Sequence, residues 1–359
     1  MFKLKYDDFL VYDESTGTYS MSAEQQVRDQ TEKSHWKNTG LTILKDWRLY
    51  IMLIPMILVY LLWKYMPMYE LIASFKYGTE ISALDRDWVG ASNFETIFTN
   101  VTYSVQFWRA FRNTFTLAFY GLLFGFPMPI ILALFFNEVR SNITRSIIQV
   151  CVYLPKFLST VVVTTLAISL FRGPNGAGTE MGIVSKFITM ICGANSDIGM
   201  QADVVGNGLI YSTRYFRAIY IVTDLWEHAG YDSIVFFAAI IAVSPTSYEA
   251  AQIDGAGKMQ QMRYVVLPSI LSTVVIMLIM KMGSLLSIGY EKLYLFCSGP
   301  TIGNYEVASV VSTLANSWGA NQNTAAYGIA GEMMNNIIGM ILVIGSNFIA
   351  RKASDVSLY

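Results

Sequence analysis

The sequence is poor in charged residues and in the side chains that most enzymes use for catalysis or metal binding. Only 14% of its 359 residues are charged, and it has two histidines and three cysteines. Soluble domains carry about 25% charged residues, so this shortage predicts a protein that lies mostly in a membrane. Two histidines leave few ligands for a metal site, and three cysteines exclude a disulfide framework. A net charge of −1 provides no basic surface for nucleic acid.

The sequence also lacks a secretory signal at its start. The first 45 residues are polar and of mixed charge, without an apolar core of about 7–15 residues before a small-residue cleavage site. We therefore expect residues 1–45 to form a polar cytoplasmic N-terminal tail. Residues 46–350 should form the membrane domain, and residues 351–359 a short cytoplasmic C-terminal tail.

Long apolar runs are abundant. A hydrocarbon core about 30 Å thick needs about 20 apolar residues in each spanning helix. The sequence therefore predicts an all-α integral membrane protein with six transmembrane helices. They are expected at Leu49–Met66, Asn113–Phe136, Val150–Phe171, Ala218–Val243, Val266–Gly289 and Ala326–Ala350.

Basic residues in the short flanking segments predict the orientation, because lysine and arginine resist translocation. They precede the first predicted helix and follow the second, fourth and sixth: Lys37, Lys45, Arg48, Arg140, Arg145, Lys258, Arg263, Arg351 and Lys352. Both termini should then face the cytoplasm. Four arginines in the opposite segments weaken the contrast: Arg109, Arg112, Arg214 and Arg217.

The loop between predicted helices four and five, residues 244–268, has the features of a docking element. Ser244 and Pro245 suit the start of a helix, and Gly255 can take the left-handed conformation that ends one. A second short helix can follow before the next membrane helix. The two alanines after Glu249 permit close approach of another backbone, and Glu249 offers a charge to a partner.

This pattern resembles the EAA loop of binding-protein-dependent ABC importer permeases. In that family Glu-Ala-Ala is followed by three residues, Gly, nine residues and Ile-x-Leu-Pro. The matching residues are Glu249, Ala250, Ala251, Gly255, Leu267 and Pro268, whereas Val265 stands where Ile is usual. Asp254 before Gly255 further resembles the sugar-importer branch, which includes the maltose transporter permeases.

The resemblance extends from Trp47 almost to the C-terminus, and it is closest to permeases of the polysaccharide or complex-oligosaccharide type. The segments that carry it include Pro67-Met68-Tyr69, Phe107-Trp108-Arg109, Asn137-Glu138-Val139-Arg140, Tyr153-Leu154-Pro155 and Tyr305-Glu306-Val307-Ala308. Residues 1–40 lie outside the match.

The resemblance implies a type I ABC importer permease fold in a bacterial cytoplasmic membrane. It also implies four kinds of partner: a second permease subunit, a cytoplasmic ABC ATPase dimer, an extracytoplasmic solute-binding protein and a carbohydrate substrate. In such importers the EAA loop sits in a cleft of the ATPase and transmits its closure to the membrane helices.

We expect no cofactor in this chain, with ATP bound by the partner ATPase. The stretch Gly255–Lys258 is similar to a P-loop, which requires Gly-x-x-x-x-Gly-Lys-Ser/Thr. Here Gln252 replaces the first glycine and Met259 replaces the hydroxyl residue. The chain is therefore interpreted as a transport subunit and not an enzyme.

Two alternatives remain: a permease of the same class for a non-sugar solute, and a membrane-embedded enzyme. An enzyme would need a nucleophile with a base, or metal ligands, at membrane depth. A single intramembrane histidine and the lack of a His-Glu-x-x-His motif argue against most versions of it. A purely structural membrane partner would leave the EAA spacing unexplained.

Helical spacing suggests where the substrate pathway lies. The candidate polar residues are Asp224, Glu227, His228, Tyr231, Lys281, Ser284, Glu332, Asn335 and Asn336, and aromatic faces are expected from Trp226, Tyr231 and Tyr290. Residues three, four and seven positions apart share one helix face, and charged groups at this depth should face protein or a wet cavity. Lys281 is expected to neutralise Glu227 or Glu332. Packing against the second permease is the open alternative, and no metal site is expected.

Overall fold

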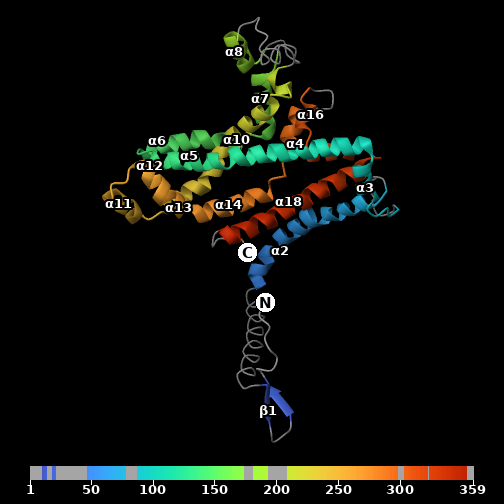
Figure 1. Cartoon of the computed structure of the whole chain (residues 1–359), viewed down its shortest axis with the longest axis horizontal. Coiled ribbons are helices and arrows are strands. Elements are labelled where there is room, and N and C mark those ends of the chain that lie inside the picture. Colours follow the sequence, from blue (N-terminus) through green and yellow to red (C-terminus); the bar gives the residue numbers. More distant parts are fainter. Residues whose placement is uncertain are drawn as a thin grey trace. The chain divides into compact units, whose positions relative to one another are not determined.

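A computed structural model describes residues 10–13, 18–21, 47–77, 87–173, 181–192, 208–297, 303–321 and 323–353 of the chain (Figure 1). The chain divides into two compact units, Met1–Glu70 and Leu71–Tyr359. Each unit is described by itself below.

The first unit contains a small hairpin that the sequence patterns did not predict. Strands β1 (Leu10–Asp13) and β2 (Thr18–Met21) pair antiparallel, with Leu10 opposite Met21. A helical run begins in this unit with α2 (Trp47–Tyr60) and continues through the π-helical η2 (Leu61–Tyr65) into the 3₁₀-helical η3 (Met66–Phe75), whose last residues belong to the second unit. This helical run is longer than the predicted Leu49–Met66.

The second unit is helical in its described part, apart from two isolated β-bridges. Its elements are α3 (Ser92–Thr99), α4 (Val101–Gly125), α5 (Pro127–Glu138), α6 (Asn142–Tyr153), η5 (Leu154–Phe157), α7 (Thr160–Phe171), α8 (Ile183–Cys192), η6 (Leu209–Tyr211), α10 (Phe216–Ile241), α11 (Pro245–Ile253), α12 (Lys258–Gln261), η7 (Met262–Val266), α13 (Leu267–Ser269), α14 (Leu271–Gly283), α15 (Tyr290–Phe296), α16 (Tyr305–Ala308), α17 (Val311–Gly319) and α18 (Ala325–Ala353).

In the described residues, three helical runs are long and apolar enough to cross a membrane alone: Tyr50–Phe75, Val101–Glu138 and Ala325–Ile349. Three further candidates each consist of two helices joined at a bend, so the chain has three to six candidate spans. Helices α10 and α18 begin within two residues of the predicted positions. Helix α4 begins at Val101, well before the predicted Asn113.

The prediction of one helix over Val150–Phe171 is wrong. Residues Asn142–Phe157 and Thr160–Phe171 meet at an angle of 97°. Pro155 lies in the last turn before the bend, and Leu158 and Ser159 are extended. The Ser159 hydroxyl then accepts a hydrogen bond from the Val162 backbone N–H at 3.3 Å, which caps a new helix.

The fifth predicted helix also differs from Val266–Gly289. Residues Lys258–Ser269 and Leu271–Gly283 meet at 63°, and α14 ends at Gly283. Hydropathy averages over such a break, so the apolar run from Val266 gives no sign of it. The segment after α14 forms the short helix α15, whose Leu293 and Phe296 are fully buried.

Helix α10 is at the centre of the second unit. It packs along α5 and also contacts α4, α6 and α7. Near its start, Phe216 packs edge-on against Phe296 of α15 with ring centres 5.9 Å apart. Near its end, Phe236 and Ile240 join Ala133 of α5 in a buried cluster that also contains residues of η7 and the start of α14. A third cluster joins α3, α4, α17 and α18.

Gly230 sets the distance between α10 and α6. A Cβ at this buried position would lie 2.1 Å from the carbonyl oxygen of Val152, which belongs to α6. Only the absence of a side chain permits this close approach of two backbones.

Replacing Gly230 with Ala should therefore force α6 and α10 apart. We expect the free energy of unfolding to fall by about 1–3 kcal/mol, the usual cost of overpacking. Thermal unfolding of the purified transporter in detergent would measure it. Gly339→Ala on α18 is the matched control, because no atom lies within 4 Å of the position that its new methyl group would occupy. Equal melting temperatures for the two variants would contradict the prediction.

Candidate functional site

A cavity of about 640 Å³ lies beside the central helix α10. Its wall combines an apolar side from α4 with polar groups from α10, η5, α14 and α15. The charged and titratable lining residues are Lys156, Asp224, Glu227, His228, Lys281, Glu291 and Lys292. Ser159, Thr160, Ser284 and Ser287 add hydroxyl groups.

The helical spacing of α10 brings its polar residues together as predicted. Asp224, Glu227 and His228 each place one nitrogen or oxygen atom within 4.8 Å of the others. The His228 Nδ1 lies 3.6 Å from Asp224 Oδ1 and 3.9 Å from Glu227 Oε2. It also lies 3.2 Å from the Asp224 backbone carbonyl one turn earlier, which fixes the ring over this face of the helix.

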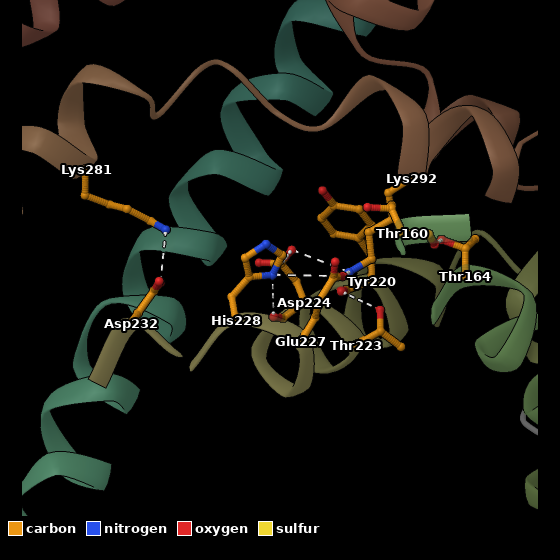
Figure 2. Close-up of polar contacts among 10 residues, drawn as sticks. All are labelled: Thr160, Thr164, Tyr220, Thr223, Asp224, Glu227, His228, Asp232, Lys281 and Lys292. Carbon is orange, nitrogen blue, oxygen red and sulfur yellow. Dashed lines mark hydrogen bonds and ion pairs between the residues drawn. The ribbon is translucent and has the colours of Figure 1, made fainter. Parts of the chain in front are cut away.

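Lys292 of α15 reaches this cluster from the opposite wall (Figure 2). Its ammonium lies 2.9 Å from Glu227 Oε2 and 3.5 Å from Asp224 Oδ1. The side chains of Lys292 and Glu227 are only 4% and 6% exposed, so this is a buried ion pair between α15 and α10. The ammonium also lies 5.5 Å from the centre of the Tyr220 ring, in reach of a cation–π interaction.

Three ligand-type side chains within this distance have the spacing of a metal site. Lys292 already supplies the positive charge that Asp224 and Glu227 require. We therefore assign the cluster to an ion-pair network. Fixed carboxylate, imidazole, ammonium and hydroxyl groups around a cavity can bind a ligand that has many hydrogen-bonding groups.

Sequence reasoning missed Lys292 because its position depends on the return of the chain after α14. The residue lies beyond the predicted end of helix five at Gly289, in a segment expected to be an outer loop. No local pattern around Tyr290-Glu291-Lys292 indicates that the lysine turns inward. Its burial is a consequence of α15 packing on α7 and α10.

A second cavity, of about 230 Å³, adjoins the first, since Lys281 and Ser284 line both. Its wall also contains Asp232 of α10, and the Lys281 ammonium lies 4.0 Å from Asp232 Oδ2. The expected pairing of Lys281 with Glu227 or Glu332 is therefore wrong. Glu227 pairs with Lys292, while Lys281 faces a carboxylate farther along α10. Asp232 was missed although it lies one turn beyond His228 on the same face.

Other predicted pathway residues do not line either cavity. Trp226 and Tyr231 are 47% and 45% exposed, and Tyr231 packs edge-on against Phe157. Tyr290 stacks on Tyr294 with ring centres 5.3 Å apart. None of these three aromatic side chains contributes to the lining of either cavity.

The polar residues of α18 also lie apart from the cavities. Helix α18 packs against α14, α17 and α3. The Asn335 side chain is buried and donates a hydrogen bond to the Leu286 carbonyl at 3.3 Å. Glu332 is partly buried, and its Oε2 has no hydrogen-bond partner in the described residues. Asn336 is exposed.

The EAA loop forms two short helices with a tight connection, as the sequence indicates. Helix α11 begins at Pro245, and Gly255 ends it with a φ of +76°. The backbone N–H of Ala256 donates to the Ala251 carbonyl at 2.9 Å, and that of Gly255 donates to the Gln252 carbonyl at 3.0 Å. These two bonds are those of a helix end that favours glycine at the left-handed position.

The surface of the loop is exposed and partly apolar. Ile253 and Met259 are 87% and 74% exposed. Six of the seven predicted coupling residues are exposed as well, and Ala251 is half-buried: Glu249, Ala250, Asp254, Gly255, Leu267 and Pro268. An exposed apolar surface beside a carboxylate is typical of a protein–protein contact.

Residues 125–350 match the family described as binding-protein-dependent transport system inner membrane component. The chain belongs to this family. It is 33% identical over 316 residues to Protein LplB of Bacillus subtilis (strain 168), covering 88% of this chain and 92% of that protein. It is 32% identical over 329 residues to YteP of the same organism, a polygalacturonan/rhamnogalacturonan transport system permease protein, covering 91% of this chain and 95% of that one.

A solved structure agrees with these relatives. The chain is similar to one chain of a bacterial alginate ABC transporter in complex with alginate pentasaccharide-bound periplasmic protein. The TM-score is 0.73 and the identity 33%, over 90% of this chain and 99% of the other. The resemblance to type I ABC importer permeases seen in the sequence is thereby confirmed.

The buried pair of Lys292 and Glu227 can be tested by removing its cation. Lys292→Met leaves the Glu227 carboxylate buried beside Asp224 without a positive partner, and we expect a loss of about 3–5 kcal/mol of folding free energy. Lys281→Met breaks a pair whose side chains are 41% and 36% exposed. That change should cost at most about 1 kcal/mol.

Unfolding of the purified, assembled transporter compares the two variants. The double variant Lys292→Met/Glu227→Gln should recover much of the loss, because the unpaired buried charge is gone. A Lys292→Met protein as stable as Lys281→Met would refute the buried pair.

Proposed function

We propose that the chain is a permease subunit of an ATP-driven ABC importer that takes up carbohydrate, in particular oligosaccharides. The observation that carries this proposal is the similarity, over about nine-tenths of the chain, to a permease named for polygalacturonan and rhamnogalacturonan and to an alginate transporter chain. The polar cavity beside α10 supports it. A saccharide presents many hydroxyl groups, and the cavity wall offers hydroxyl, carboxylate and ammonium partners for them.

The topology that we propose has six membrane spans and both termini in the cytoplasm of a bacterium. Each bent pair then provides the helix of one span, with α11 and α12 of the EAA loop outside the membrane, and the basic residues of the short loops face inward. Residues 1–45 and 351–359 form the cytoplasmic tails, and residues 46–350 form the membrane domain. This orientation places the EAA loop on the cytoplasmic side, where an ATPase can reach it.

The proposed pathway combines the two cavities. Asp224, Glu227, His228, Lys281 and Ser284 contact the substrate or hold its neighbours in place. A volume of about 640 Å³ is within the range of small-molecule sites, roughly 300–1,000 Å³. The exposed and half-buried candidates outside the cavities complete the pathway where a second permease subunit packs: Trp226, Tyr231, Tyr290, Glu332 and Asn336. Asn335, which is buried, holds the Leu286 backbone in place instead.

Energy enters through the EAA loop in this proposal. A separate cytoplasmic ATPase dimer binds ATP and docks on the exposed loop surface, and an extracytoplasmic binding protein delivers the sugar. The chain itself performs no chemistry. ATP binding by the partner biases the helices between two arrangements, because the loop contacts differ in free energy between them.

Changes in the loop should uncouple transport without preventing membrane insertion. Gly255→Pro removes the left-handed conformation at φ +76°, and Glu249→Ala removes the exposed carboxylate. We expect little ATPase to copurify with either variant and uptake to fall by at least tenfold, about 1.4 kcal/mol of coupling. Gly339→Ala is the control. Normal uptake by the Gly255→Pro variant would contradict the proposed role of the EAA loop in coupling.

The substrate can be tested with labelled acidic and neutral oligosaccharides in cells with and without the gene. Lys156 lines the cavity, is partly buried and has no ion-pair partner in the described residues, so its ammonium is available to a carboxylate on the sugar. Lys156→Gln should lower uptake of an acidic oligosaccharide by about tenfold, the worth of a hydrogen bond to a charged group.

The control for this variant is Thr116→Ala, an exposed hydroxyl on α4 that bonds only within its own helix. Uptake of a neutral oligosaccharide that is equally sensitive to Lys156→Gln would contradict a carboxylate partner. If the gene affects uptake of no oligosaccharide, the alternative of a permease for a non-sugar solute takes its place.

A further inference from the structure

The end of helix α5 holds the EAA loop from the side. The loop is continuous with α10 before it and with η7 and α14 after it. In addition, the Lys258 ammonium of α12 forms an ion pair with the Glu138 carboxylate, the last residue of α5. The Tyr248 hydroxyl of α11 lies beside the side chain of Asn137, which influences its pKa. Each helix of the loop is thus tied to α5 by one contact.

From this arrangement we propose that Asn137 and Glu138 are positioning residues for energy coupling. They link the EAA loop to α5, so that motion imposed on the loop reaches the cavity wall through α5 and α4 as well as through α10. We call these two contacts the α5 clamp. The proposal rests on the proposed function, because it assumes that the loop receives the motion of an ATPase.

The clamp adds a side-on support at points where the chain changes direction. Helices α10 and α11 meet at 70°, with the break at residues 242–244. Gly255 separates α11 from α12 in a conformation that only glycine adopts readily. The clamp contacts lie on either side of Gly255 and hold both helices against the same support.

Packing beside the clamp supports a rigid link. Tyr248 packs against the buried cluster that contains Ala133 of α5 and Phe236 and Ile240 of α10. Burial raises the pKa of the Tyr248 hydroxyl, the Asn137 side chain partly offsets this, and the nearby Glu138 carboxylate adds a smaller increase. The net pKa is raised, so the hydroxyl stays protonated and neutral at physiological pH. Helix α5 in turn packs along α10.

A single helical run, α4 followed by α5, connects the clamp to the cavities. Helix α5 follows α4 across Phe126, and the two together form one membrane-crossing run. Leu117 and Gly121 of α4 line the larger cavity, and Gly125 and Pro129 line the smaller one. A displacement of the α5 end therefore acts on the same helical run that lines both cavities.

Because the ion pair is exposed, its effect on transport can be measured separately from any effect on folding. The side chains of Lys258 and Glu138 are 62% and 33% exposed, and exposed pairs contribute little to stability. Their substitution should leave the protein folded, inserted and bound to its ATPase. A loss of transport in such variants then reports on the transmission of motion.

A charge exchange tests the clamp in the complete transporter. Glu138→Lys and Lys258→Glu each place like charges together and should lower uptake about fivefold or more, the lower range of allosteric coupling, while ATPase copurification is unchanged. The hydrolysis of ATP per sugar transported should rise. The double variant Glu138→Lys/Lys258→Glu restores opposite charges and should return uptake to at least about half of the wild-type rate.

Two further variants complete the test. Arg263→Glu is the matched control, a charge reversal at an exposed position of the same loop whose guanidinium lies over the neighbouring Tyr264 ring. It should leave the ATP-to-sugar ratio near that of wild type. Tyr248→Phe keeps the packed ring but deletes the hydroxyl beside Asn137, and it should raise the same ratio.

Three outcomes would overturn the clamp: single charge reversals with normal uptake, loss of the ATPase from the complex in those variants, or a double variant that fails to recover. The second outcome would make the pair part of the docking surface. None of them affects the proposed function, which stands or falls on wild-type oligosaccharide uptake and on the effect of Gly255→Pro.

Discussion

The polar face of α10 imposes the main constraint on this structure. Asp224, Glu227 and His228 lie within two turns of a largely apolar helix and should not face hydrocarbon, because charge at membrane depth is costly to solvate. In the fold, α15 packs over this face, and the Lys292 ammonium lies 2.9 Å from Glu227 Oε2. The neighbouring helices then enclose a polar cavity where a fully apolar bundle would pack without one.

How well the sequence predicts each element depends on whether the cause is local. Helices α10 and α18 follow from long, mainly apolar runs, and the end of α11 follows from Gly255. The bend before Thr160 cannot be predicted from a local pattern, because the hydropathy of Val150–Phe171 is high on both sides of it. The family and its fold were accessible from the EAA spacing, which depends on residue types and not on tertiary contacts.

The polar site was only partly accessible. Asp224, Glu227 and His228 were brought together by helical periodicity alone, which a sequence shows directly. The cation that pairs with them could not be predicted in this way, since Lys292 belongs to α15, a short helix with no periodic signal in the sequence. The pairing of Lys281 with Asp232 depends on how far α14 is shifted along α10. Such a shift is set by the packing of apolar side chains, and no motif records it.

The lining of the larger cavity has a consequence for the kind of ligand that it can select. Three lysines and three carboxylates line it together with His228. Side chains of opposite charge are equal in number, so the wall offers individual charged groups without a strong field of one sign. A ligand of this cavity is therefore selected by where its polar groups meet these side chains, and long-range attraction contributes little.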